Sequence, residues 1–179
     1  MDVATALYAS AAVLLVVAGA VKVARPASTV DLLEDLGAPQ VDVVPAHRLV
    51  WVMGFVEIVV GVAALAVGGL ALALFVSAFY VIFALSVVQA LSVGASSCGC
   101  FGRVEAPPSW IHVAGNAVFA IASAVAAAGR TPLEVMADQP AGGVGFVVLI
   151  GVIAGLALVA FTALPEALAA RAAVSGRRG

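Results

Sequence analysis

One apolar stretch in the first half of the chain constrains the fold more than any other feature. Within residues 49–93, only Glu57 and Gln89 are strongly polar. As a single helix rising 1.5 Å per residue, this stretch would be roughly 67 Å long, about twice the thickness of the hydrocarbon core of a bilayer. It must therefore fold back on itself. The expected turn is Gly68-Gly69, because paired glycines break a helix at little cost.

The composition of the whole chain also indicates a membrane protein. Hydrophobic residues make up 64% of the chain and charged residues 10%, with a mean hydropathy of +1.21. Soluble domains average about 25% charged residues, and a small soluble fold could not cover so much apolar surface. A formal net charge of −2 excludes a basic surface for nucleic acid. We therefore expect an integral membrane protein whose partner is the lipid bilayer, and neither an ordinary soluble enzyme nor a disordered chain.

The apolar segments predict an all-α, polytopic membrane protein with a four-helix transmembrane core and a fifth C-terminal transmembrane helix. Helices are expected because lipid offers backbone groups no hydrogen-bond partners. Residues 1–165 would form a single transmembrane domain closed by Pro165, and residues 166–179 a flexible polar tail. A short amphipathic helix over 28–37 would either lie on the membrane surface or serve as a plain connector. The expected spans are residues 4–24, 48–68, 70–93, 109–128 and 144–164.

Positive charge is distributed unevenly between the two ends of these spans. Seven of the eight Lys and Arg residues fall on the side that holds the C-terminus, and only Arg130 falls on the other side. Cytoplasmic loops of membrane proteins carry an excess of Lys and Arg. The count predicts a multi-pass protein with its N-terminus outside the cell and its C-terminus in the cytoplasm.

The two cysteines of the chain lie together as Cys98-Gly99-Cys100, in the predicted loop between the third and fourth spans. They reach the Cα separation of a disulfide, about 4.4–6.8 Å, only in a turn, which Gly99 permits. A disulfide in so small a ring is strained and easily reduced, which favours redox exchange over cross-linking. The reduced pair could instead bind a soft metal such as Cu(I) or Zn, or be incidental. Arg103 nearby would favour the thiolate form.

Polar side chains within the spans gather in the half of the membrane beneath this loop. Such groups are costly in lipid and usually serve a function. Glu57, for example, lies nine residues after Arg48, which is roughly 13 Å below that surface. The opposite halves contain little beyond hydroxyl groups. This asymmetry predicts a polar pocket under the cysteine loop. Its expected members are Lys22, Glu57, Gln89, His112 and Asn116, with Arg103 from the loop.

Several of these members have two interpretations. Lys22 either extends to the lipid headgroups or pairs with Glu57. Glu57 itself lies between Gly54 and Gly61, which favour close helix packing, so it either links two helices or holds an ion pair or a proton. His112 is either a general base for a cysteine thiol or an inert histidine at the membrane interface.

Three segments give the chain a resemblance to a known family. They are residues 19–26 (GAVKVARP), 54–61 (GFVEIVVG) and 98–102 (CGCFG). On these residues the sequence resembles the MauE/DoxX group of redox-associated bacterial membrane proteins, and MauE most closely, over roughly residues 4–128. The resemblance implies a four-helix core in the bacterial plasma membrane. It also implies a role in methylamine utilisation, namely maturation or disulfide handling of methylamine dehydrogenase with a thioredoxin-like partner.

Three functions remain open from the sequence. The first is a thiol–disulfide oxidoreductase in which Cys98 and Cys100 cycle between dithiol and disulfide, with a thioredoxin-like partner and a membrane quinone as the electron carriers. The second is binding or transport of a soft metal ion or small solute by the same thiolates, with Glu57 and His112 as lining. The third is a non-catalytic membrane assembly factor. The first conflicts with the charge count, because disulfides form outside the cytoplasm whereas the count places both cysteines inside.

Overall fold

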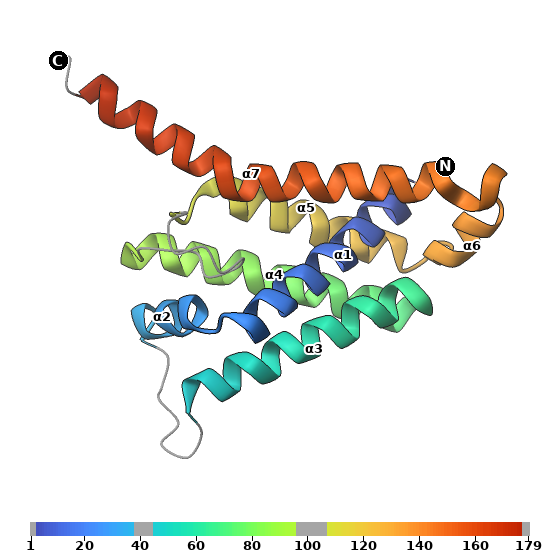
Figure 1. The fold of residues 1–179 in the computed structure, drawn as a ribbon, viewed down its shortest axis with the longest axis horizontal. Helices are drawn as coiled ribbons and strands as arrows, with labels where there is room; N and C mark the ends of the chain where they lie inside the picture. The colour runs from blue at the N-terminus through green and yellow to red at the C-terminus, as the bar shows by residue number, and fades with distance from the viewer. Residues whose placement is uncertain (1–2, 38–44, 96–106, 177–179) are drawn as a thin grey trace.

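The computed structural model describes residues 3–37, 45–95 and 107–176, and the secondary structure of these residues is entirely helical (Figure 1). The elements are α1 (Val3–Ala24), α2 (Ala27–Asp35), α3 (Ala46–Ala66), α4 (Leu70–Val93), α5 (Trp110–Ala126), α6 (Pro132–Ala137), the short 3-10 helix η1 (Pro140–Gly143) and α7 (Val144–Gly176).

Four of these helices are long and apolar enough to cross a bilayer, namely α1, α3, α4 and the part of α7 up to Pro165. The apolar helix α5 has 17 residues. At 1.5 Å per residue it is about 26 Å long, slightly less than the hydrocarbon core of about 30 Å. The prediction of an all-α, polytopic membrane protein is confirmed, although α5 is shorter than the span expected over 109–128.

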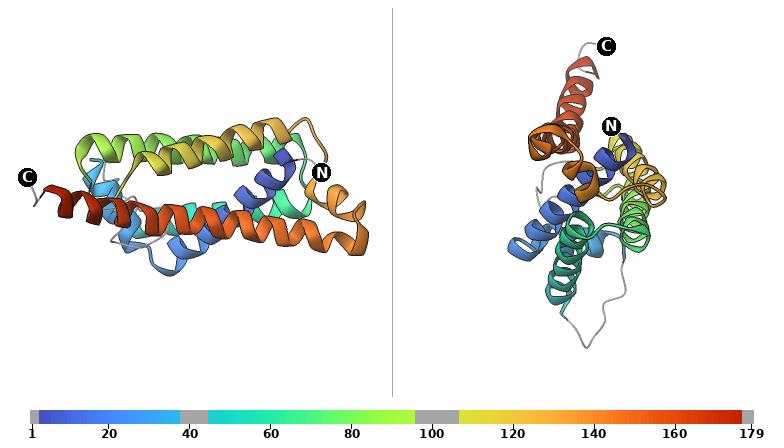
Figure 2. Two further views of the ribbon diagram at one scale, coloured as in Figure 1. Left: turned by 90° about the horizontal axis from the view of Figure 1, so that it is seen from above. Right: turned by 90° about the vertical axis from the view of Figure 1, so that its right-hand side faces the viewer.

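Helix α1 is the centre of the bundle. It buries a larger share of its residues than the other three long helices, and it packs against α3, α4, α5 and α7. Small residues on several sides of α1, such as Ala9, Ala11 and Ala12, are fully buried and let the neighbours approach. The tightest pairs are α1 with α3 and α4 with α5, and α7 lies along α1 and α5 (Figure 2).

Glycines set the close approach of α1 and α3. A Cβ atom added to Gly54 would lie 2.7 Å from the carbonyl oxygen of Gly19, and one added to Gly61 would lie 2.7 Å from that of Ala12. No larger residue fits there unless the helices separate. The interpretation of Gly54 and Gly61 as packing positions is confirmed.

The turn between α3 and α4 lies where the sequence predicts it. Gly68 and Gly69 have φ angles of +65° and +91°, which L side chains rarely adopt. At the same end, α6 begins with a reciprocal cap in which the backbone N–H of Thr131 donates to Glu134 and the backbone N–H of Glu134 donates to the Thr131 hydroxyl. The hydrogen bond from the Thr131 backbone lowers the pKa of Glu134.

The opposite end of the bundle carries the candidate functional residues, and we call it the site end. It comprises the C-terminal ends of α1 and α4 and the N-terminal ends of α3 and α5. Helix α2 packs there against α3 and α4 (Figure 1). This helix confirms the predicted short helix between the first two spans, and it stops before Gly37, whose φ is +65°.

The predicted last span, residues 144–164, agrees with the part of α7 that is long and apolar enough to cross a bilayer, Val144–Pro165, but the helix itself does not end there. Helix α7 continues through Pro165 to Gly176, so residues 166–176 are helical and no tail begins at 166. Proline removes one backbone hydrogen bond, but the segment that follows it is rich in alanine, the best helix former. In Figure 1 the ribbon of α7 changes direction before its C-terminal part, as expected for a helix that contains proline.

The glycine contact can be tested with two matched substitutions. Gly54→Ala should lower the free energy of unfolding by about 1–3 kcal/mol, because the added methyl group forces α1 and α3 apart. Gly155→Ala in α7 has open space around it and should be neutral or stabilising by about 0.5–1 kcal/mol. Denaturation by SDS in mixed micelles, followed by circular dichroism, measures both. Equal stability of the two variants would contradict the proposed packing.

Candidate functional site

A buried ion pair joins α1 and α3 at the site end. The Lys22 Nζ donates to Glu57 Oε2 at 2.9 Å, and the side chains are 4% and 0% exposed. Two charges in a membrane bundle are costly to bury, so this pair is the most unusual feature of the described chain. The interpretation of Lys22 as a side chain extending to the lipid headgroups is wrong, because its ammonium is turned inward to Glu57.

The glycine contact explains why these two side chains meet. Lys22 lies one turn after Gly19, and Glu57 lies one turn after Gly54. A Cβ on Gly54 would be 3.0 Å from the Cβ of Lys22, and a Cβ on Gly19 would be 3.0 Å from the Cβ of Glu57. Each charged side chain therefore begins directly over the glycine of the other helix. Only backbone lies beneath it, which leaves room for the two chains to extend toward each other.

The surroundings of the pair are only partly polar. The ring of Phe83 from α4 lies with its centroid 5.1 Å from Lys22 Nζ, within the range of a cation–π interaction. Glu57 Oε1 is buried, and the described residues provide no hydrogen-bond partner for it. A buried acceptor without a partner is destabilising, so such groups are rare in folded proteins.

His112 and Asn116 form the second buried polar group, on the first two turns of α5. They are 1% and 5% exposed. The hydroxyl of Ser109, the residue before the helix, lies 2.8 Å from His112 Nδ1 and does not cap the helix backbone. The His112 ring stacks on Phe161 of α7, with centroids 5.5 Å apart and planes at 17°. His112 thus lies inside the bundle and not at the lipid interface.

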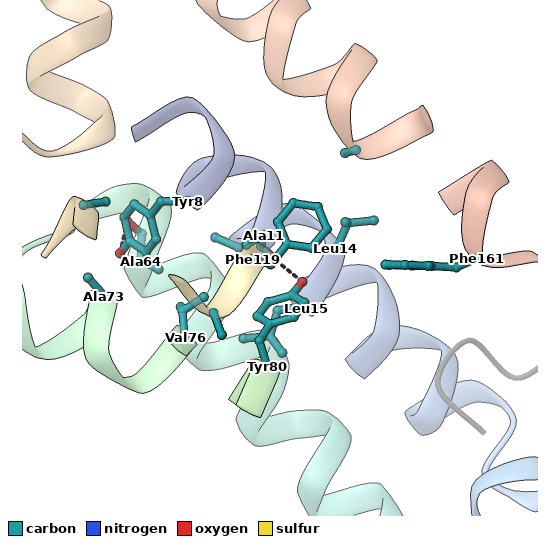
Figure 3. Packing of buried hydrophobic residues seen from close by; sticks show 14 residues of the cluster. Tyr8, Ala11, Leu14, Leu15, Ala64, Ala73, Val76, Tyr80, Phe119 and Phe161 are labelled. Atoms are coloured by element: carbon teal, nitrogen blue, oxygen red, sulfur yellow. Dashed lines mark hydrogen bonds between the residues drawn. The ribbon is translucent and has the colours of Figure 1, made fainter. Parts of the chain in front are cut away.

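An unbroken series of aromatic contacts connects His112 to Lys22 through the interior. The Tyr80 hydroxyl in this series donates to the Ala11 carbonyl of α1 at 2.8 Å (Figure 3). The two polar groups are therefore linked through aromatic side chains of α4, α5 and α7. The rings from His112 onward are Phe161, Phe119, Tyr80 and Phe83, with successive centroid distances of 6.5, 5.3 and 5.7 Å.

Other predicted site residues are placed differently or not described. Gln89 is exposed on α4, so the structure does not bring it together with the buried group. Cys98, Cys100 and Arg103 lie outside the described residues. They belong to the connection between Ala95, which follows α4, and Pro107, which precedes α5. Both flanking helices end at the site end.

Sequence reasoning did not identify Phe83, Ser109 or Phe161, which contact the buried polar side chains. Ser109 was recognisable, since it lies three residues before His112. Phe83 and Phe161 are two of many apolar residues in long spans, and only the packing of the helices singles them out.

The arrangement offers proton-transfer groups and no metal site in the part of the chain that is described. No cluster of three or more His, Cys, Asp or Glu side chains occurs there. A carboxylate, an ammonium and an imidazole are present instead, and each of these is a group that is able to take up or release a proton.

Comparison with families of known proteins gives a match over residues 2–129 to the family described as methylamine utilisation protein MauE. This region is more than half of the chain and contains α1 to α5 complete. No curated protein and no solved structure matches the chain.

A double-mutant cycle tests the buried ion pair. Lys22→Met and Glu57→Leu should each lower the free energy of unfolding by about 3–5 kcal/mol, because each leaves one buried charge without its partner. The double variant should lose less than the sum of the two. The exposed pair of Arg130 with Asp138 provides the control, and Asp138→Asn should cost about 0–1 kcal/mol. Strictly additive losses for Lys22 and Glu57 would show that the pair does not interact.

Proposed function

The chain belongs to the MauE family of methylamine utilisation proteins, and from this membership we propose that it is a membrane component of methylamine utilisation that carries out thiol–disulfide exchange through Cys98 and Cys100. A thioredoxin-like protein is the proposed partner. The finding that supports the proposal most directly is the concentration of buried ionisable groups at the site end, where the connection that contains both cysteines begins and ends.

The proposed exchange transfers two electrons and two protons between the cysteine pair and a partner that has a dithiol and a disulfide form. The dithiol form of Cys98 and Cys100 loses a proton, and one thiolate attacks the disulfide of the partner to give a mixed disulfide. The second thiolate then attacks the first sulfur and releases the partner. Two electrons pass to the partner, whose disulfide becomes a dithiol after it takes up two protons. The same steps run in reverse when the partner is the reductant.

Proton transfer is the role we assign to the buried polar residues. Each turn of the cycle removes protons from thiols or returns them. An imidazole has one nitrogen that can accept a proton and one that can donate it, which suits His112 to the role of a general base for a thiol. Lys22 and Glu57 provide a second proton-exchanging pair at the same end of the bundle. Glu57 Oε1, which lacks a described partner, is the acceptor with spare capacity.

The charge distribution favours one of the two redox pools that the thiols could meet. By the predicted spans, seven of the eight basic residues fall on the side of the membrane that holds the cysteine loop, so the positive-inside rule favours a cytoplasmic position for this loop. There the pair would receive electrons from a reduced thioredoxin-like protein. On the outer face it would instead take part in disulfide formation.

Cysteine labelling in intact cells tests both the chemistry and the sidedness. The two cysteines are the only ones in the chain, so a Cys98→Ser/Cys100→Ser variant has no thiol to label and serves as the negative control. We expect a mass-tagged maleimide to count two free thiols after reduction and none after mild oxidation, and we expect a membrane-impermeant reagent to leave them unlabelled. A trapped mixed disulfide in one of the single Ser variants would identify the partner.

The same wild-type protein and cysteine variants distinguish redox exchange from metal binding and from a non-catalytic assembly role. Cysteines that never change oxidation state in cells would end the redox proposal. Bound copper or zinc in the purified wild-type protein, lost in Cys98→Ser, would replace it with metal binding. A double Ser variant that fully supports growth on methylamine would indicate an assembly role without chemistry.

A further inference from the structure

We propose that α7 is an intramolecular cover for the His112 side of the site, and that Phe161 is the positioning residue through which it acts. Its bearing on thiol chemistry rests on the role proposed above for His112. The packing of α7 over His112 is a separate claim, and it is tested by measurements that need no redox activity.

Helix α7 is an addition to the family core. The family match ends at residue 129, before α6 and α7 begin. Nevertheless α7 packs along α1 and α5, and the Ser10 hydroxyl of α1 donates to the Ile150 carbonyl at 3.4 Å. Its two buried phenylalanines, Phe146 and Phe161, are 1% and 4% exposed. They lie about 22 Å apart along the helix axis, so Phe146 docks the N-terminal end of α7 and Phe161 its middle.

Phe161 fits into a slot on α5 that glycine creates. Gly115 lies one turn after His112, and a Cβ on Gly115 would collide with the ring of Phe161. The ring lies against His112 on one side and meets Phe119 edge-on, with centroids 6.5 Å apart and planes at 76°. Figure 3 shows Phe161 pointing from α7 toward the cluster around α1.

This contact determines how the imidazole is held. The stacked ring covers one face of His112, and the Ser109 hydroxyl lies at Nδ1, so the ring plane and one nitrogen are both fixed. Without Phe161, lipid tails or water would reach that face. The cover also lies next to a weak point in α7, because Pro165 has no N–H to donate to the carbonyl of Phe161, four residues earlier.

Chemical modification of histidine measures the cover directly. The chain has two histidines, and His47 is exposed on α3, so it serves as an internal reference. Diethylpyrocarbonate would be applied to the full-length protein in nanodiscs, and the rates at both residues read by peptide mass spectrometry. In the wild type we expect His112 to react about tenfold more slowly than His47, or slower still, because reaction requires local opening.

Substitutions on both sides of the contact then identify Phe161 as the cause. Phe161→Ala should raise the rate at His112 about tenfold while leaving His47 unchanged, and Phe161→Tyr should keep the protection. Gly115→Ala should have the same effect as Phe161→Ala, because its methyl group pushes the Phe161 ring away while the sequence of α7 stays unchanged. If Phe161→Ala does not fold, the Gly115→Ala variant alone tests whether the Phe161 ring protects His112. The matched control is Phe146→Ala, which removes the other docking phenylalanine of the same helix.

The outcomes separate this proposal from the proposed function. Rapid modification of His112 in the wild type would overturn the cover, as would unchanged protection in Phe161→Ala or in Gly115→Ala. Equal deprotection by Phe146→Ala would also overturn it, since docking of α7 as a whole would then be responsible. Deprotection confined to the Phe161 and Gly115 variants supports the cover whether or not Cys98 and Cys100 prove to be redox-active.

Discussion

The ion pair between Lys22 and Glu57 is the interaction on which the organisation of the site end depends. Burying two charges in a helix bundle is unfavourable unless they lie against each other with good geometry. Gly19 and Gly54 supply that geometry, because they bring the two backbones together one turn from the charged residues. The same glycines and charges belong to the segments on which the family resemblance rests. We therefore regard the glycine contact and the ion pair as one unit, in which the packing exists to hold the charges.

The remaining parts of the bundle extend this unit. Phe83 of α4 lies beside the ammonium, and the aromatic series continues from it to His112 on α5. The buried ionisable side chains are thereby concentrated at the site end, whereas the other end has the tight Gly68-Gly69 turn and the capped helix α6. A bundle built only for stability would have no reason to bury an ammonium, a carboxylate and an imidazole in the same half.

The sequence predicts the fold well and the site only in part. Hydropathy and paired glycines are local signals, and they correctly indicated the helices, the α3–α4 turn and the end at which polar groups gather. The pairing of Lys22 with Glu57 depends on the rotation of two helices about their axes, which periodicity does not determine in spans that are apolar all round. For the same reason Gln89 was expected inside and is exposed, since it lies off the buried face of α4 that contains Val87 and Ala90. Pro165 closes the predicted span but does not end the helix, because the strong helix formers after it outweigh one lost hydrogen bond.

The most direct test of the central claim, that the buried polar residues serve the thiol pair, is the rate of thiol–disulfide exchange between the reduced protein and a small aromatic disulfide. It would be compared between the wild type, His112→Gln and the Lys22→Met/Glu57→Leu double variant, each confirmed as folded in nanodiscs. Loss of a general base typically slows a reaction about 100-fold or more, so we predict a fall of that order for His112→Gln and a smaller fall for the double variant. Wild-type exchange rates in both folded variants would contradict the account and leave the buried polar residues with a role in packing alone.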